Sequence, residues 1–209
     1  MLSKFLTLAL AATVFAYAMP AAQTSPVTPN PSQVSIAGIA YGGTGCPQGS
    51  IGSFISADRQ TFTLIFDQFV ASIGPGVGVA ETRKNCQINL NMQYPSGFQY
   101  SIFSTQYRGY VELDSGVNAL QSSTFYFSGE TGQSTTSTSF KGPINGNYEA
   151  EDDVALTSTV WSPCGAPAAL NINSQVRLTT SSTTASGQIT DDSIDGKITF
   201  VVGVQWQKC

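Results

Sequence analysis

Residues 149–153 form the densest group of side chains that could do chemistry. They carry four of the 13 acidic residues of the chain. A glycosidase needs two carboxyl groups about 5 to 10 Å apart across a cleft, and an acidic group of this kind could supply them. Runs of charge usually stay exposed to solvent, so a solvated acidic turn is the favoured interpretation. The carboxylates considered for a pair are Glu149, Glu151, Asp152 and Asp153, together with Asp67, Glu112 or Asp114.

A second acidic group, Asp191, Asp192 and Asp195, lies near the C-terminus. Such loops can bind Ca²⁺ through oxygen ligands, but the EF-hand spacing is absent and residues 193–194 interrupt the alternation of ligands. Asp and Gly populate turns readily, so a solvated turn is favoured. These three residues are the candidate metal ligands.

Amide side chains alternate with apolar residues in two separate segments. The polar positions include Asn89 and Asn91 in the first segment and Asn171 and Asn173 in the second. Asn is unfavourable in strands, so its repetition suggests a sugar-binding surface in which amides bond hydroxyls and an aromatic ring stacks on a sugar. A hydrated sheet face with the aromatics in the core is the favoured alternative. The candidate carbohydrate-binding residues are Asn89, Asn91, Asn171, Asn173 and Tyr107, with Gln175, Tyr110 and Tyr126 as further contributors.

The chain contains no histidine. This excludes catalytic triads with a histidine base and histidine-ligated zinc or copper. The formal charge is −4, and it becomes one unit more negative if Lys4 is lost with a cleaved leader. Arg83, Lys84 and Arg108 are too few for a basic patch and are expected to be strand-end charges. Nucleic-acid binding is therefore not expected, because phosphate neutralisation requires clustered Lys and Arg, and no cofactor is expected.

The four cysteines, Cys46, Cys86, Cys164 and Cys209, favour two disulfides. An even count in an exported chain is typical of disulfide bonding, and the spacing fits neither a zinc site nor a redox CxxC motif. Four cysteines allow three pairings. We expect Cys46 with Cys86 and Cys164 with Cys209, because each bond then joins neighbouring segments. Closing loops of this size stabilises a fold by about 4 kcal/mol each in the chain-entropy model.

The first 18 residues have the features of a secretory signal peptide. Lys4 precedes an apolar run, and the small residues Ala16 and Ala18 precede the expected cleavage site. The run is shorter than the roughly 20 apolar residues needed to span a bilayer, so membrane insertion is not expected. Residues 19–33, rich in Pro, Ser and Thr, are expected to be a flexible lead-in, and residues 34–209 a single domain.

The rest of the chain favours an all-β fold, a single-domain antiparallel β-sandwich of jelly-roll-like type with two disulfides. Apolar and polar residues alternate most clearly in 86–94 and 170–179, which is typical of half-buried strands. Further strands are expected at 34–41, 61–73, 98–113, 124–129, 154–161 and 198–206.

Turns and connections are predicted from Gly, Pro and polar clusters. Residues 95–97 are expected to form a hairpin turn, and a bend or bulge is expected near Arg108 and Gly109. Residues 130–139 and 181–195 are expected to be loops. The stretch 140–164 is expected to connect an N-terminal group of strands to a C-terminal pair.

An ordered set of short motifs runs along the chain and resembles the secreted family catalogued as domain of unknown function 4360. The motifs are 41–47 (YGGTGCP), 83–87 (RKNCQ), 107–109 (YRG), 140–143 (FKGP) and 161–165 (WSPCG). The resemblance spans nearly all of the expected mature chain. It implies a small exported protein, of a kind found mostly in fungi and bacteria, and it supplies no catalytic residue.

These observations favour a secreted binding or interaction protein, either a cell-wall-associated factor or an effector. A polysaccharide or an extracellular protein is the expected partner, and the oligomeric state is left open. The alternative is a carbohydrate-active, glycosidase-like enzyme that uses a carboxylate pair.

Overall fold

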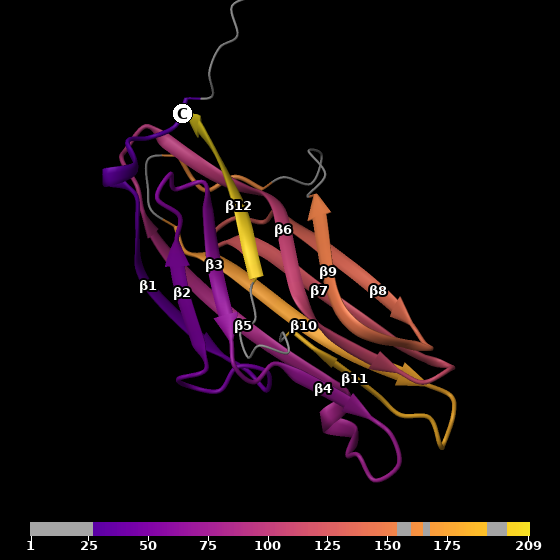
Figure 1. Ribbon diagram of the computed structural model, residues 1–209. Helices are drawn as coiled ribbons and strands as arrows, with labels where there is room; N and C mark the ends of the chain where they lie inside the picture. Colours follow the sequence, from indigo (N-terminus) through magenta and orange to yellow (C-terminus); the bar gives the residue numbers. More distant parts are fainter. Residues whose placement is uncertain (1–26, 154–159, 165–167, 192–199) are drawn as a thin grey trace, which may run out of the picture.

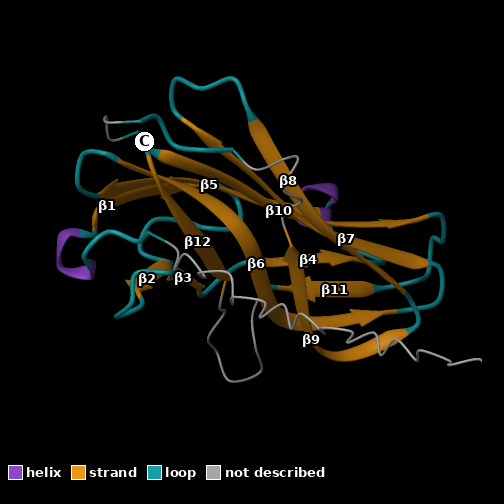
Figure 2. Ribbon diagram, turned by 90° about the horizontal axis from the view of Figure 1, so that it is seen from above, coloured by secondary structure: helices purple, strands orange, loops and turns teal. Residues whose placement is uncertain are grey.

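Two antiparallel sheets packed face to face make up the computed structural model, which describes residues 27–153, 160–164, 168–191 and 200–209 (Figure 1). Viewed from above, β5 and β10 lie in one layer, and β6 and β11 lie in the other (Figure 2). The predicted β-sandwich is confirmed. The expected signal peptide and most of the expected lead-in lie outside the described residues.

The five-stranded sheet contains the two strands with the clearest alternation. Its order is β1 (Ser35–Gly42), β5 (Arg83–Gln93), β10 (Leu170–Thr180), β7 (Val117–Phe127) and β8 (Gln133–Lys141). In β5, Ile88 and Leu90 are buried, whereas Asn89 is half-buried and Asn91 is exposed. Because successive side chains point to opposite faces of a strand, the apolar side of β5 packs against the other sheet and its amides point outward.

The seven-stranded sheet forms the other layer. Its order is β2 (Ile51–Ile55), β3 (Thr61–Phe66), β12 (Phe200–Lys208), β6 (Phe98–Leu113), β11 (Gly187–Thr190) and β4 (Val70–Ile73), and β9 (Ile144–Asp153) pairs with β6. Two short 3₁₀ helices, Pro31–Gln33 and Val79–Thr82, lie outside the sheets. No helix in the described part of the chain is long and apolar enough to cross a membrane.

The turn at 95–97 carries the chain from one sheet to the other. β5 lies in the five-stranded sheet and β6 in the seven-stranded sheet, so the predicted hairpin is wrong. Both edges of β5 are already occupied, by β1 and by β10, which leaves no edge for β6. Gly97 adopts a φ of 85°, a conformation that glycine reaches without a steric penalty.

Three segments that were expected to be loops or connections contain strands. β8 replaces most of the expected loop at 130–139, β9 fills the middle of the expected connection at 140–164, and β11 lies within the expected loop at 181–195. The strand expected at 154–161 falls mostly outside the described residues, although Trp161 forms an isolated bridge with Ser101.

The side of β6 that faces the core changes at Phe103. Tyr100 and Ile102 are buried before this point, and Thr105 and Tyr107 are buried after it, while Phe103 itself is exposed. The pairing of β6 with β12 loses register at the same place, as expected for a β-bulge. The irregularity of β6 therefore lies about five residues before the bend or bulge predicted near Arg108 and Gly109.

Aromatic rings fill the space between the two sheets. Tyr100 contacts Phe127 and Trp206 edge-on or tilted, with ring centroids 5.1 and 5.4 Å apart. Large aromatic side chains bury more apolar surface than other residues, and that burial is the main favourable contribution to folding.

The predicted disulfide pairing is confirmed. Cys46 bonds Cys86, with Cα atoms 5.5 Å apart, and Cys164 bonds Cys209, with Cα atoms 5.8 Å apart. The first bond fastens the turn after β1 to the neighbouring strand β5. The second fastens the segment before β10 to the last residue of the chain.

Candidate functional site

The two amide-bearing strands predicted from the sequence lie side by side. Asn89 of β5 pairs directly with Asn171 of β10, and Gln87 pairs with Asn173. The Asn89 Nδ2 atom donates a hydrogen bond to Asn171 Oδ1 over 3.1 Å. The amide positions predicted in two distant segments of the sequence therefore form one continuous surface across β5 and β10.

The four asparagines differ in how much of each side chain is accessible. Asn171 is only 8% exposed, and its Nδ2 atom donates to Ser128 Oγ over 2.9 Å. Asn91 and Asn173 are exposed. Asn171 therefore holds Asn89 in position, while Asn91 and Asn173 can reach a ligand.

Tyr126 of β7 supplies an aromatic ring beside the asparagines. It pairs with Asn171 on the outer side of β10, it is half-buried, and its hydroxyl accepts a hydrogen bond from Gln87 Nε2 over 3.4 Å. We call this surface the amide face. It comprises Gln87, Asn89 and Asn91 of β5, Asn171, Asn173 and Gln175 of β10, and Ser122, Thr124 and Tyr126 of β7.

Tyr107 does not belong to the amide face, and its prediction as a sugar-binding residue is corrected. It is 1% exposed, and its ring stacks on Phe200 with centroids 4.6 Å apart. Its hydroxyl lies 3.1 Å from Thr136 Oγ1 inside the sandwich. A side chain enclosed in this way cannot contact a polysaccharide. Tyr110, by contrast, lies on the outer side of β6, in the other sheet.

Polar side chains gather around the Tyr107 hydroxyl between the two sheets. Burial raises the pKa of Tyr107 to about 12, and nearby Ser123, Thr136, Thr105 and Gln121 partly oppose this rise. The Gln121 amide is fully buried and makes no well-formed hydrogen bond, although it lies close enough to the Tyr107 hydroxyl to lower the pKa of that group. We call this group the polar interior: Thr105, Tyr107, Gln121, Ser123, Thr136 and Ser174.

Asp191, one of the candidate metal ligands, is buried and bonded to Tyr148. The Tyr148 hydroxyl donates to Asp191 Oδ1 over 2.7 Å, and burial raises the pKa of Asp191 to about 7. The Tyr148 ring lies against Gly109, where a Cβ atom would collide with that ring and with the Thr190 carbonyl oxygen. Asp191 thus joins β9 to the end of β11.

The metal prediction has no further support in the described part of the chain. Asp192 and Asp195 lie outside the described residues. Among the residues that the structure describes, no three His, Cys, Asp or Glu side chains come together as a metal site.

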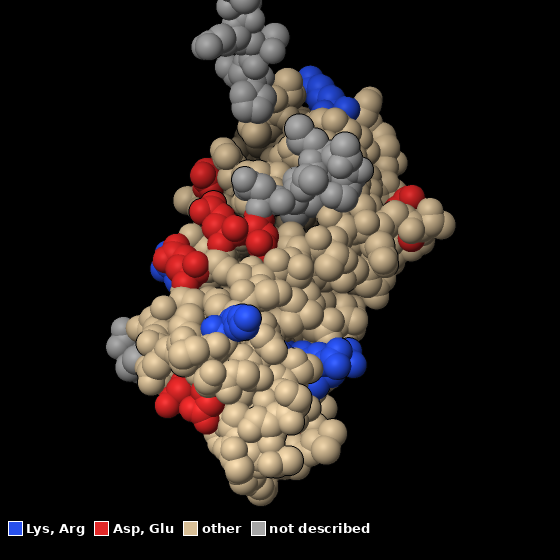
Figure 3. Space-filling model, turned by 90° about the vertical axis from the view of Figure 1, so that its right-hand side faces the viewer, with Lys and Arg blue, Asp and Glu red and all other residues tan. Residues whose placement is uncertain are grey.

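The carboxylates of residues 149–153 divide between the two sides of β9. Glu149 and Glu151 are exposed on the outer side, whereas Asp152 Oδ2 accepts a hydrogen bond from Thr138 of β8 over 3.1 Å. Glu149 Oε1 accepts bonds from Gln106 Nε2 over 2.6 Å and from Arg108 Nη2 over 3.2 Å. We call Gln106, Arg108, Glu149 and Glu151 the acidic face. Figure 3 views the β8 and β9 side of the molecule, where most of the acidic atoms gather at the upper left.

Two of the other carboxylates line one hollow. Glu112 and Asp114 border a depression of about 400 Å³ between β4, β6 and β11. Glu112 is in β6, and Asp114 lies one residue beyond the end of that strand. Asp114 Oδ2 accepts the backbone N–H of Ser186 over 2.8 Å. Glu112 lies four residues along β6 from Arg108, the partner of Glu149, so it is about 13 Å from the acidic face by the rise of a strand. Asp67 is exposed beyond the end of β3.

Comparison with known proteins places the chain in a family. The model of the domain of unknown function DUF4360 matches residues 32–209. The chain belongs to the DUF4360 family. A relative in Arthroderma benhamiae, described as an uncharacterized secreted protein, is 56% identical over 181 residues, which cover 87% of this chain and 74% of that protein.

Similarity of this DUF4360 chain to solved structures is weak. TmCBM61 in complex with β-1,4-galactotriose is 9% identical with a TM-score of 0.27, over 83% of this chain and 90% of that one. The enzymatically active domain of tailspike protein 4 from bacteriophage CBA120 is 16% identical with a TM-score of 0.24, over 86% of this chain and 20% of that one. Because both TM-scores are below 0.5, neither likeness indicates a function for the DUF4360 chain.

Proposed function

We propose that this protein is an extracellular binding protein that holds polysaccharide chains on its amide face. The observation that carries the proposal is the pairing of Asn89 with Asn171 through a 3.1 Å hydrogen bond, next to the ring of Tyr126. Amides both donate and accept hydrogen bonds, as sugar hydroxyls do. A ring held at the same level offers an apolar surface to the face of a sugar.

Three observations support an extracellular location. The leader predicted at residues 1–18 has the composition of a secretory signal peptide. The Arthroderma benhamiae relative is described as secreted, and the confirmed disulfides are typical of oxidising compartments.

The lateral hydrogen bonds of the amide face favour binding of a polymer rich in hydroxyl groups. Gln175 Nε2 donates to Ser122 Oγ over 3.1 Å, and Thr124 bonds Thr135 over 2.9 Å, so side chains on four neighbouring strands are held in place. Side chains fixed in advance lose less conformational entropy when a ligand binds. The middle of this face carries no carboxylate among the described residues, which suits a ligand without positive charge.

Retention on insoluble polysaccharides tests the proposal. The purified mature protein is incubated with chitin, β-glucan and cellulose, and the bound fraction is measured beside Asn173→Ala, Tyr126→Ala and a control, Asn147→Ala, which lies on exposed β9. We expect retention of the wild type and of the control, with binding weakened about fivefold or more in the other two, because each lost contact is worth about 1 kcal/mol. Equal retention of all four proteins would remove the amide face from the proposal.

A glycosidase-like activity is the second candidate, and the hollow lined by Glu112 and Asp114 is the observation in its favour. Both carboxyl groups border the same hollow, and a glycosidase needs two such groups across one cleft. Soluble reducing sugar measured in the same tubes tests this candidate. Release that is abolished by Glu112→Gln would support it, and release unchanged by both Glu112→Gln and Asp114→Asn would refute it.

A further inference from the structure

Three basic side chains gather at one end of the amide face. Arg177 of β10 pairs directly with Arg83 of β5, and Lys141 of β8 pairs with Asn118 of the intervening strand β7. All three basic residues are exposed. Like charges directly opposite each other across two strands are destabilising, so the Arg83–Arg177 pair requires an explanation other than stability.

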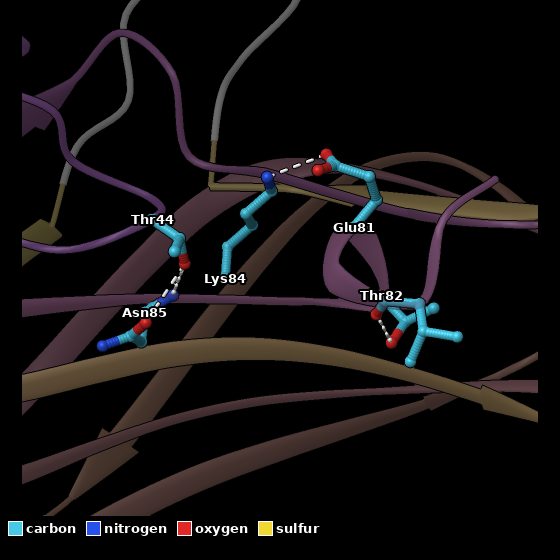
Figure 4. Close-up of polar contacts among 6 residues, drawn as sticks. Thr44, Glu81, Thr82, Lys84 and Asn85 are labelled. Atoms are coloured by element: carbon cyan, nitrogen blue, oxygen red, sulfur yellow. Dashed lines mark hydrogen bonds and ion pairs between the residues drawn. The ribbon is translucent and has the colours of Figure 1, made fainter.

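No ion pair neutralises this basic end within the described residues. The ion pairs among the described residues are Lys84 with Glu81 and Arg108 with Glu149, and none of them includes Arg83, Arg177 or Lys141. Figure 4 shows the first of them, in which Lys84, next to Arg83 in the sequence, is turned toward Glu81. The whole chain has fewer basic than acidic residues, so a general excess of positive charge does not account for the cluster.

A hollow lies between two of these cations. It measures about 510 Å³, and its lining includes Asn118, Leu120, Ser139, Lys141, Arg177 and Thr179. It therefore combines an apolar floor, amide and hydroxyl groups, a guanidinium and an ammonium, without a carboxylate. Guanidinium groups bind carboxylate or sulfate oxygens in a two-pronged geometry, while an ammonium acts as a compact point charge.

The basic end is continuous with the amide face along β10. Asn173, Gln175 and Arg177 are alternate residues of this strand and point to the same side. The distance from Asn173 to Arg177 is about 13 Å by the rise of a strand, which is enough for more than one sugar unit.

We propose that the basic end binds the anionic group of an acidic polysaccharide whose sugar rings lie on the amide face. The anion is a uronate carboxylate or a sulfate ester, held by Arg177 and Lys141 with Arg83 beside them. This inference rests on the proposed function and narrows the substrate class from polysaccharides in general to anionic ones.

Affinity for soluble polymers tests the inference. The mature protein is titrated with hydroxyethylcellulose as the neutral probe, polygalacturonate as the carboxylate probe and dextran sulfate as the sulfate probe. We expect at least one anionic polymer to bind about tenfold more tightly than the neutral one at low salt, and the difference to shrink at high salt because ions screen exposed charges. The anionic polymer that binds more tightly identifies the anion.

Matched variants locate the effect. Arg177→Gln and Lys141→Gln should each weaken binding of the anionic polymer about fivefold or more, because one charge contact is lost. Neither variant should change the affinity for the neutral polymer. Arg108→Gln, on the other sheet, is the control and should change neither. Since Arg177→Gln also relieves the like-charge pair with Arg83, it should unfold at the same or a slightly higher temperature, so loss of folding does not explain loss of binding.

Several results would overturn the inference. If the neutral polymer binds and the anionic polymers bind no more tightly, the basic end is not a site, although the proposed function stands. If no polymer binds, both fail. Single-stranded DNA bound as tightly as polygalacturonate, or an equal effect of Arg108→Gln, would indicate general attraction to polyanions in place of a sugar site.

Discussion

The amide face and the acidic face are both polar surfaces of the sandwich, but they satisfy their polar groups differently. On the amide face, neutral side chains bond one another across strands, as Asn89 does with Asn171. On the acidic face, Glu149 is bonded to Gln106 and Arg108. The first surface keeps accessible donors and acceptors beside a fixed ring, and the second satisfies its main charge internally.

This difference indicates which face is suited to a ligand. Asn91 and Asn173 are exposed, and neither is held by a charge. Glu149 must give up a cation and an amide before its Oε1 atom can bind anything else. A surface ion pair of this kind contributes little to stability. Its carboxylate is solvated and already bonded, so it is poorly suited to a catalytic role.

The largest expected effect concerns Asp191, which anchors the strand beneath the acidic face. Burial raises the pKa of Asp191 to about 7 from 3.8, so the folded protein binds this proton more tightly than the unfolded chain does. The stabilisation from this tighter proton binding is fully present below about pH 4 and is lost as the pH rises to about 7. The free energy of unfolding falls by about 4 kcal/mol over this range.

The variant Asp191→Asn tests this dependence. Asn keeps an oxygen that can accept from Tyr148, so we expect the variant to gain stability relative to wild type between pH 4 and pH 8. Denaturant unfolding at both pH values measures the free energy, with Glu151→Gln, an exposed position, as the control. A difference between variant and wild type that is the same at both pH values would contradict the prediction.

The second effect concerns the strand β7, which carries Tyr126 on its outer side and Gln121 inside. Gln121→Leu should raise the free energy of unfolding by about 2 kcal/mol, because it removes buried amide atoms that make no well-formed hydrogen bond. Retention on polysaccharide should not change, since the outer side is untouched. A loss of stability, with the exposed control Asn118→Leu unaffected, would show that the Gln121 amide is satisfied in solution.

The third effect compares the two faces directly. Asn91→Ala should weaken retention on polysaccharide about fivefold, because it removes a contact worth about 1 kcal/mol, whereas Glu149→Gln should leave retention unchanged. Binding isotherms of the two variants on the same polymer provide the measurement. The reverse ranking would move the binding surface to the acidic face.

The smallest effect is expected for the ion pair of the acidic face. Arg108→Gln should lower the free energy of unfolding by less than about 0.5 kcal/mol, because the pair is exposed and Glu149 keeps its bond to Gln106. Chemical denaturation at low and high salt measures this change. A loss well above 1 kcal/mol would mean that the pair holds β9 in place.

The alternation of β5 and β10 could be predicted from the sequence because each strand has one apolar side and one amide side. The strand β8 could not, and its polar inward positions explain why. The inward positions of β8 include Ser134 and Thr136, which are buried but polar. A strand that faces polar groups lacks the apolar repeat by which strands are recognised, so a strand was mistaken for a loop.

The candidate site was predictable in part for a similar reason. The asparagines were found by alternation, but which strand lies beside which depends on register, and register brings Arg83 opposite Arg177. Tyr107 was misassigned because the irregularity at Phe103 exchanges the inner and outer sides of β6. Nothing in the local sequence marks that exchange.

The irregular pairing of β1 affects whether copies of this protein could pair edge to edge. β1 is an edge of the five-stranded sheet, and its register with β5 shifts between Ile36 and Gly38. An edge interrupted by a bulge is a poor template for a strand of another molecule. If the proposed function holds, neighbouring copies bound to one polysaccharide chain would stay separate molecules and would not assemble through β1 into a fibre.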